Sequence, residues 1–107
     1  MCGFTIWYNK NKNINKKLFL ESANLIENRG PDYSKTYFFN DDKKIENQNS
    51  NINLAINHKR LKIIDTSDLS NQPMFSEDEK DIILFNGAIY NFKKLKNKYK
   101  IKTKSSG

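Results

Sequence analysis

The sequence predicts a single small α+β domain, and three observations support this class. Residues 3–8 alternate in the manner of a strand, residues 16–28 carry apolar side chains at helical spacing, and further short strand and helix patterns follow. The chain has 107 residues, enough for one modest core. No window approaches the roughly 18 apolar residues that a membrane span needs.

The first half of the chain predicts a strand, a helix and a second strand. Residues 3–8 are rich in aromatic and β-branched types, so Phe4, Ile6 and Tyr8 share one strand face. After a polar turn over residues 9–15, Leu18, Ser22, Leu25 and Ile26 recur at helical spacing, and Gly30 and Pro31 stop the helix. Residues 37–39 form a short strand, and the polar stretch 40–51 is a turn or loop.

The second half predicts two further strands and a final helix. Leu54, Ile56 and His58 alternate on one strand, which continues through residues 60–64 into a polar segment, 65–71. Residues 82–85 have the composition of a buried strand that ends at Asn86 and Gly87. Asn91 can cap a helix whose Phe92, Leu95 and Tyr99 lie three and four residues apart.

Charge and cysteine content narrow the classes of function. The formal net charge of +7 favours phosphate-bearing partners, but the basic residues are almost all scattered lysines, so a nucleic-acid-binding module is the less favoured alternative. A single cysteine excludes a disulfide framework. Residues 1–3 lack the basic and apolar run of a secretory signal, so we expect a cytoplasmic protein that does not contact a membrane.

That cysteine, Cys2, becomes the N-terminal residue if Met1 is removed. A thiol is a competent nucleophile only as the thiolate, and an α-amine that titrates near pH ~8 can accept its proton. One residue would then supply both nucleophile and base. The alternative is a small buried apolar side chain without chemistry, which is common for cysteine.

Five strings in series resemble the glutaminase domain of glutamine-hydrolysing asparagine synthetases, a class II glutamine amidotransferase of the N-terminal nucleophile hydrolase type. They are the segments 2–3 (Cys-Gly), 29–32 (Arg-Gly-Pro-Asp), 58–65 (from His58 to Asp65), 72–74 (Gln-Pro-Met) and 85–91 (from Phe85 to Asn91). The resemblance implies an αββα sandwich of which residues 1–107 supply about the N-terminal half, as a partial class II glutamine amidotransferase domain.

The resemblance also implies roles for particular residues. Cys2 is the catalytic nucleophile with its own α-amine as base, Asn86 and Gly87 form the oxyanion hole, and Arg60 binds the α-carboxylate of L-glutamine through two parallel hydrogen bonds. The substrate-binding set also includes Asn86 and Gly87, and it is completed by Leu61, Lys62, Ile63, Ile64 and Ala88. We expect a structured loop near the site at Arg29 and Asp32, and no catalytic role for His58.

Two of these site predictions have purely structural alternatives. As a bare dipeptide, Asn86-Gly87 is more often a turn between two strands, and Arg60 could be an ordinary surface arginine. No metal site is expected, and no phosphate-cradling glycine loop is visible. The resemblance implies that ATP and Mg²⁺ act in a synthetase domain that is absent from this chain. The oligomeric state stays open between a monomer and a homodimer.

Two departures from the resembling family bear on activity. Ala88 stands where the family has glutamate, and the chain ends at Gly107 before the family's Asp-Thr-Glu string. We therefore expect an N-terminal fragment that binds glutamine poorly and has little activity, whose longer form is an asparagine-forming ligase with an attached synthetase domain. A degenerate amidotransferase-like partner protein is the first alternative, and Ala88 is the feature that favours it.

Overall fold

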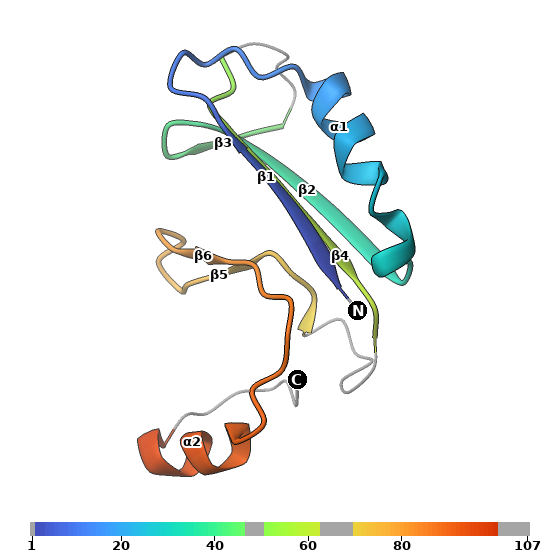
Figure 1. Ribbon diagram of the computed structural model, residues 1–107. Coiled ribbons are helices and arrows are strands. Elements are labelled where there is room, and N and C mark those ends of the chain that lie inside the picture. The colour runs from blue at the N-terminus through green and yellow to red at the C-terminus, as the bar shows by residue number, and fades with distance from the viewer. Residues whose placement is uncertain (1, 47–50, 63–69, 101–107) are drawn as a thin grey trace.

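The computed structural model describes residues 2–46, 51–62 and 70–100 (Figure 1). The described chain combines helices with antiparallel strands, and most of the strands follow one another without a helix between them, as expected for the α+β class. The elements are β1 (Gly3–Tyr8), α1 (Lys16–Asn24), the single 3₁₀ turn η1 (Glu27–Arg29), β2 (Tyr33–Asn40), β3 (Lys43–Ile45), β4 (Leu54–Arg60), β5 (Met74–Phe75), β6 (Ile82–Ile83) and α2 (Phe92–Tyr99).

The centre of the molecule is a four-stranded antiparallel sheet in the order β1-β4-β2-β3. β4 lies between β1 and β2, and every residue of β4 except Leu54 is buried. His58 of β4 pairs with Phe4 on one side and with Lys35 on the other. This central position makes β4 the best-supported element for holding functional side chains.

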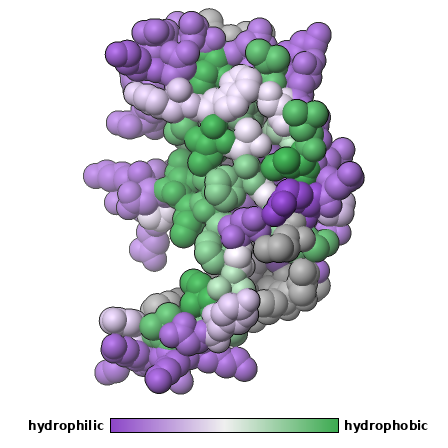
Figure 2. Space-filling model, in the orientation of Figure 1, coloured by the Kyte–Doolittle hydropathy of each residue, from purple (hydrophilic) through white to green (hydrophobic). Residues whose placement is uncertain are grey.

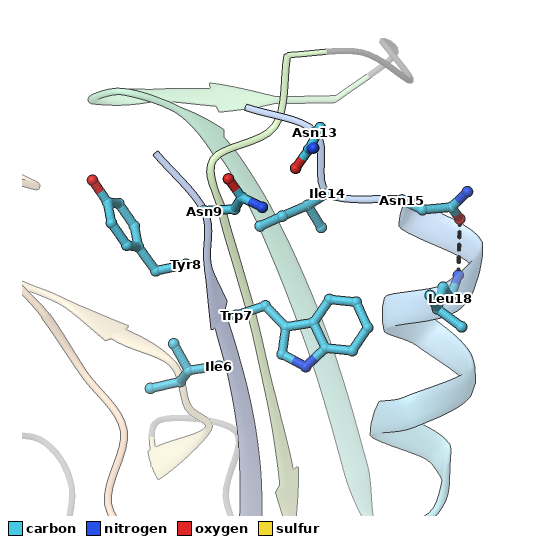
Figure 3. A pocket seen from close by; sticks show the side chains of 8 residues that line it. All are labelled: Ile6, Trp7, Tyr8, Asn9, Asn13, Ile14, Asn15 and Leu18. Atoms are coloured by element: carbon cyan, nitrogen blue, oxygen red, sulfur yellow. Dashed lines mark hydrogen bonds between the residues drawn. The ribbon is translucent and has the colours of Figure 1, made fainter. Parts of the chain in front are cut away.

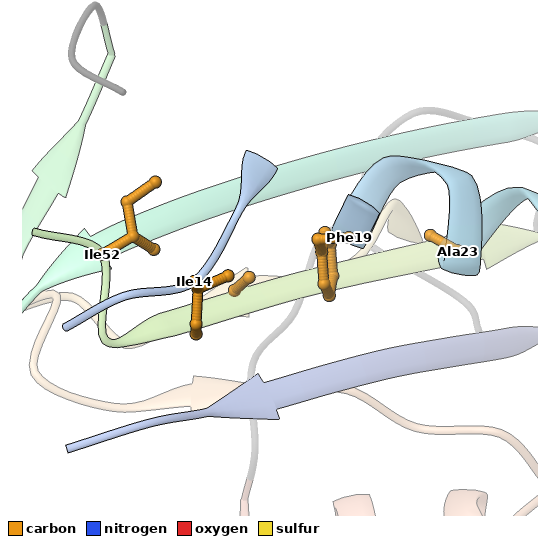
Figure 4. Packing of buried hydrophobic residues seen from close by; sticks show 5 residues of the cluster. Ile14, Phe19, Ala23 and Ile52 are labelled. Carbon is orange, nitrogen blue, oxygen red and sulfur yellow. The ribbon is translucent and has the colours of Figure 1, made fainter. Parts of the chain in front are cut away.

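The helix α1 covers one face of this sheet (Figure 1). Asn15 caps its N-terminus, because the Asn15 side-chain oxygen accepts a hydrogen bond from the Leu18 N–H at 3.0 Å. Phe19 and Ala23, four residues apart, are fully buried against the sheet (Figure 4). The ring of Phe19 meets Trp7 of β1 edge to face, with centroids 5.4 Å apart. This packing forms the apolar core.

The helix differs from the prediction in its length and in its buried face. It ends at Asn24 rather than near residue 28, since the Leu25 N–H bonds back to Ser22 three residues earlier and tightens the last turn. Leu18 and Leu25, predicted on the periodic face, are 54% and 87% exposed. Phe19 takes the inward position instead, because its ring fills more of the space over Trp7.

The two faces of β1 are used differently. Trp7 points toward α1, whereas Ile6 and Tyr8 point to the opposite side (Figure 3). Phe4, Ile6 and Tyr8 do share a face, as predicted, and they are 41%, 47% and 70% exposed. Figure 2 shows apolar surface gathered over the middle of the molecule, where β1 and the β5–β6 pair lie in Figure 1.

A second, two-stranded sheet made of β5 and β6 lies on the side of the main sheet away from α1 (Figure 1). Phe75 of β5 packs edge to face on Tyr37 of β2, with centroids 5.0 Å apart. The Lys44 ammonium lies 4.1 Å from the centre of the Phe75 ring. The described chain therefore forms three layers: helix, main sheet and hairpin.

Four other predicted features need correction. Residues 40–51 were expected to form a loop, but β3 lies there and pairs with β2. The strand predicted at 37–39 spans the longer range Tyr33–Asn40. The buried strand predicted at 82–85 shrinks to Ile82–Ile83, and Ile83 is 58% exposed. The final helix exists, but the side chain of Asn91 makes no capping hydrogen bond.

In the described part of the chain, neither helix is long and apolar enough to cross a membrane.

Candidate active site

The structure places Cys2 against the residue that follows Arg60. The Leu61 N–H points at the Cys2 sulfur with a nitrogen-to-sulfur distance of 3.4 Å, and the thiol faces the Leu61 carbonyl oxygen at 3.9 Å. Cys2 is half-buried and free. Since Gly3 pairs with Lys59, the antiparallel register brings Cys2 level with Arg60. Two segments far apart in the sequence thus meet at one end of the sheet.

The loop at residues 29–32, predicted only to lie near the site, contacts both of these segments. The Arg29 side chain donates a hydrogen bond from Nε to the Cys2 carbonyl oxygen at 3.2 Å. Asp32 accepts a hydrogen bond from the Lys62 N–H at 2.8 Å, and its own N–H donates to the Arg60 carbonyl at 3.0 Å. The loop therefore fixes the backbone on both sides of the thiol.

Gly30 allows this loop to approach so closely. A Cβ atom on Gly30 would lie 2.3 Å from the carbonyl carbon and oxygen of Lys59. Backbone atoms cannot yield to such a contact without moving β4. Glycine is therefore required here for close packing against the strand that leads to Arg60.

Arg60 itself is buried, with 5% of its surface exposed, so the alternative of an ordinary surface arginine is wrong. Its Nη1 donates to the Asn71 side-chain oxygen at 2.6 Å. Leu61 and Lys62 are half-buried. Ile63 and Ile64, also predicted to line the glutamine site, lie outside the described residues.

The segment that contains Asn86 and Gly87 reaches the same face of the sheet. The Phe85 carbonyl oxygen lies 3.2 Å from Nε2 of His58, and the Phe85 N–H donates to the Gln72 side-chain oxygen at 2.5 Å. His58 and Arg60 lie two residues apart on β4, so they share a face. Because Phe85 precedes Asn86 directly, the predicted oxyanion residues lie beside the strand that carries Arg60.

The Asn86-Gly87 pair is not a tight hairpin turn. Such a turn needs positive φ angles at one or both central residues, and neither Asn86 nor Gly87 has one. The chain continues instead toward α2. Asn86 is half-buried, and its Oδ1 atom has no hydrogen-bond partner among the described residues. Gly87 and Ala88 are exposed.

His58 is fully buried, and it departs from an ordinary satisfied core histidine. Its Nε2 meets the Phe85 carbonyl, but Nδ1 is buried with no partner in the described part of the chain. Burial lowers the pKa of His58 below its usual value, the hydrogen bond with Phe85 opposes that shift, and the nearby charge of Arg60 adds to it. The neutral imidazole is therefore favoured.

A shallow pocket lies at the other end of β1, between that strand and the start of α1 (Figure 3). Its lining residues lie between Ile6 and Leu18 in the sequence. The far end of β1, at Tyr8, is about 20 Å of extended strand from Cys2. It contains none of the predicted site residues. Within residues 2–46, 51–62 and 70–100, no group of three His, Cys, Asp or Glu side chains could hold a metal ion.

Sequence comparisons agree with the motifs at this site. The sequence model of the family described as "Glutamine amidotransferase domain" matches residues 1–106. The chain is 36% identical to asparagine synthetase [glutamine-hydrolyzing] 1 of Arabidopsis thaliana over 76% of its length. It is 30% identical to asparagine synthetase B [glutamine-hydrolyzing] of Escherichia coli over 78% of its length, and 32% identical to asparagine synthetase [glutamine-hydrolyzing] 1 of Bacillus subtilis over 95%.

These relatives are much longer proteins. The chain spans 12%, 13% and 15% of the Arabidopsis, Escherichia coli and Bacillus relatives, respectively. No solved structure matches the chain. The family match extends over nearly the whole chain, and the structure brings the segments of Cys2, Arg60 and Asn86 to one end of one sheet face. The chain belongs to the glutamine amidotransferase domain family.

Proposed function

We propose that this chain is the part of a glutamine amidotransferase that carries the nucleophile, and that it hydrolyses the side-chain amide of L-glutamine. The observation that carries the proposal is the contact of the Cys2 sulfur with the backbone of Leu61, the residue that follows the buried Arg60. A reactive nucleophile next to a carboxylate-binding group is the arrangement that an amino-acid amide requires.

The proposed reaction begins once Met1 is removed. The α-amine of Cys2 accepts the thiol proton, and the thiolate attacks the amide carbon of glutamine. The carbonyl oxygen becomes an oxyanion, which accepts hydrogen bonds from the Asn86 side-chain amide and the Gly87 N–H. The carbon–nitrogen bond then breaks, the ammonium of Cys2 returns the proton to the leaving nitrogen, and ammonia departs.

A γ-glutamyl thioester on Cys2 remains. Water, deprotonated by the same α-amine, attacks the thioester carbon and releases glutamate with regeneration of the thiol. Arg60 holds the substrate α-carboxylate through both steps with two parallel hydrogen bonds. Leu61, Lys62, Ile63, Ile64 and Ala88 complete the wall of the glutamine site in this proposal.

The proposed fate of the ammonia rests on the similarity of this chain to glutamine-hydrolysing asparagine synthetases. In a longer polypeptide a synthetase domain would receive the ammonia and transfer it to activated aspartate, which makes asparagine in the cytoplasm. ATP and Mg²⁺ would act there. The described residues of this chain do not fit that chemistry, because they hold no cluster of metal ligands and the sequence has only 4 glycines, with no phosphate-binding loop.

We also propose that the described layers are part of an αββα sandwich. The described layers run helix, sheet, hairpin. In an αββα sandwich, β5 and β6 would belong to the second sheet, and further strands and helices would complete it. The apolar side chains exposed on β1 support this, since a buried interface between two sheets needs such residues.

The test uses the glutamine analogue 6-diazo-5-oxo-norleucine, which alkylates a reactive thiolate with loss of N₂. The chain with Met1 removed is incubated with the analogue, and mass spectrometry locates the adduct. We expect one adduct, on Cys2. The matched control is the chain that keeps Met1, in which the α-amine is blocked and labelling should be much slower.

Absence of labelling at high analogue concentration, in the processed chain and also in a longer processed polypeptide that completes the domain, would contradict the proposal and favour the degenerate partner protein. Steeply salt-dependent binding to mixed DNA or RNA, without labelling, would favour the basic nucleic-acid-binding module instead.

A further inference from the structure

Both polar groups of the Phe85 backbone are held by side chains from distant parts of the chain. The N–H donates to Oε1 of Gln72 at 2.5 Å, and the carbonyl oxygen lies 3.2 Å from Nε2 of His58. Phe85 lies beyond the end of β6 (Ile82–Ile83) and so outside the β5–β6 pairing. These two hydrogen bonds attach this backbone unit to β4 and to the segment before β5.

The chemistry of the bond to His58 is defined by its acceptor. A backbone carbonyl can only accept a hydrogen bond, so Nε2 of His58 carries the proton and donates. Nδ1 is buried without a partner in the described part of the chain, which is compatible with the neutral, Nε2-protonated tautomer. Burial lowers the pKa of His58 and favours that neutral form.

The support behind this donor is rigid. His58 is fully buried on β4, which is paired on both sides by β1 and β2. A side chain on a central strand has little freedom to follow a moving partner. The Phe85 carbonyl is therefore held by a buried side chain of a strand that is paired on both sides.

We infer that His58 and Gln72 are positioning residues, which clamp the Phe85 backbone and thereby aim the Asn86 side chain and the Gly87 N–H that follow it. The catalytic consequence rests on the proposed function, in which Asn86 and Gly87 bind the oxyanion. Oxyanion donors act only at hydrogen-bond distance, and a displacement of about 1 Å costs roughly a hundredfold in rate. Neither His58 nor Gln72 touches the reacting atoms in this arrangement.

Paired variants separate the hydrogen bonds from side-chain bulk. His58→Gln keeps an N–H donor near the position of Nε2, whereas His58→Leu keeps apolar volume without a donor. Gln72→Glu keeps the acceptor for the Phe85 N–H, and Gln72→Met keeps the length without it. Gln72 is only half-buried, so its variants should fold even if His58→Leu does not.

The kinetic readout is ammonia release from glutamine by the full chain with Met1 removed. We expect His58→Leu and Gln72→Met to lower kcat by roughly tenfold to a hundredfold with KM changed less than about twofold, because the oxyanion develops during the reaction and is absent from bound glutamine. His58→Gln and Gln72→Glu should recover most of kcat. A rise in KM as large as the fall in kcat would overturn the inference. A fall in kcat of the same size in the conservative variants would also overturn it.

A second readout does not depend on activity. Amide signals of Phe85, Asn86 and Gly87 in heteronuclear NMR should shift, and their hydrogen exchange should accelerate, in Gln72→Met and His58→Leu but not in the conservative variants. Unchanged Asn86 and Gly87 signals would overturn the clamp. If the clamp is seen by NMR but the unaltered chain neither releases ammonia nor is labelled on Cys2 by 6-diazo-5-oxo-norleucine, even within a longer polypeptide that completes the domain, the proposed function fails and the positioning of Asn86 and Gly87 stands.

Discussion

Arg60 is the residue on which substrate recognition depends in the proposed reaction. It is the end of the central strand, it is 5% exposed, and its neighbour Leu61 touches the Cys2 sulfur. The sequence predicted its role from a motif resemblance. Its burial could not be predicted, because it depends on β4 lying between two other strands.

We expect Arg60→Lys to raise the concentration of 6-diazo-5-oxo-norleucine that gives half-maximal labelling of Cys2 by about tenfold or more. A lysine ammonium cannot form two parallel hydrogen bonds with a carboxylate, and one charge-assisted hydrogen bond contributes roughly 1.5–3 kcal/mol. Labelling is followed by mass spectrometry over time. Lys17→Arg, at an exposed position on α1, is the control and should change nothing. An unaltered half-maximal concentration in Arg60→Lys would remove this arginine from the substrate site.

His58 should give the protein a stability that depends on pH. Its pKa in the folded chain is lowered by burial, so the unfolded chain binds the proton more readily. The contribution of His58 to the free energy of unfolding is therefore greatest above the ordinary histidine pKa of about 6.5, and it decreases as the pH falls below that value.

Urea unfolding at about pH 7.5 and about pH 5.5 measures this effect. The unaltered chain should be less stable at the lower pH, and His58→Gln should show a smaller difference, because glutamine does not titrate. His58 is the only histidine, so no other imidazole contributes. A pH dependence that is the same in both proteins would show that burial of His58 is not its cause.

Among the elements, β4 was predicted from its alternating pattern, but the partners of its buried polar side chains were not. The sequence predicted a strand from Leu54, Ile56 and His58, and the strand is confirmed as Leu54–Arg60. Its other face, toward α1, buries the polar side chains of Asn57 and Lys59. Asn57 donates to Thr36 Oγ1 at 2.8 Å, and Lys59 donates to Ser34 Oγ at 3.0 Å. These partners come from β2, so the sequence of β4 could not reveal them.

The elements that were mispredicted are the short ones at the edges. β3 consists of Lys43, Lys44 and Ile45, a charged composition that is typical of a loop, and it exists because pairing with β2 satisfies its backbone. The run at 82–85 was apolar enough to predict a buried strand. It pairs only through Ile82 and Ile83, because its one described partner strand, β5, has two residues.

A methyl group at Gly30, in the loop between η1 and β2, should destabilise the folded chain. We expect Gly30→Ala to lower the free energy of unfolding by about 2 kcal/mol or more, since its Cβ would lie 2.3 Å from backbone atoms of Lys59. Gly3→Ala is the matched control. Its Cβ would meet side-chain atoms of Ile26 and Arg29 at 3.0–3.2 Å, and these can move. Urea unfolding of both variants should show the larger loss for Gly30→Ala, and equal losses would contradict the close backbone contact.

At the scale of the whole molecule, one face of the main sheet is covered by α1 and the other is covered only in part by the β5–β6 pair (Figure 1). Phe4, Ile6 and Tyr8 remain 41%, 47% and 70% exposed on that second face. Neighbouring apolar side chains at such exposure form a patch that binds apolar surfaces.

We expect this 107-residue chain to bind the fluorescent dye 8-anilinonaphthalene-1-sulfonate while folded. The double variant Ile6→Thr with Tyr8→Thr should bind much less dye with a similar unfolding midpoint, because threonine keeps the β preference and neither side chain is in the core around Phe19. Leu25→Thr removes an isolated leucine that is 87% exposed, and it should leave dye fluorescence unchanged. Equal dye binding by all three proteins would exclude the β1 face as the apolar patch.

The sequence by itself determined the α+β class and the order of the main elements, and its motifs predicted the residues of the candidate site, because short-range periodicity and motif order are properties of the chain alone. Only the tertiary structure decided which face of β1 turns inward, that Arg60 is buried, and that His58 and Gln72 hold the backbone ahead of Asn86. The physical reason is that burial and hydrogen bonding between distant segments depend on how strands pair, and a strand with apolar residues on both faces, such as β1, does not reveal its inward side.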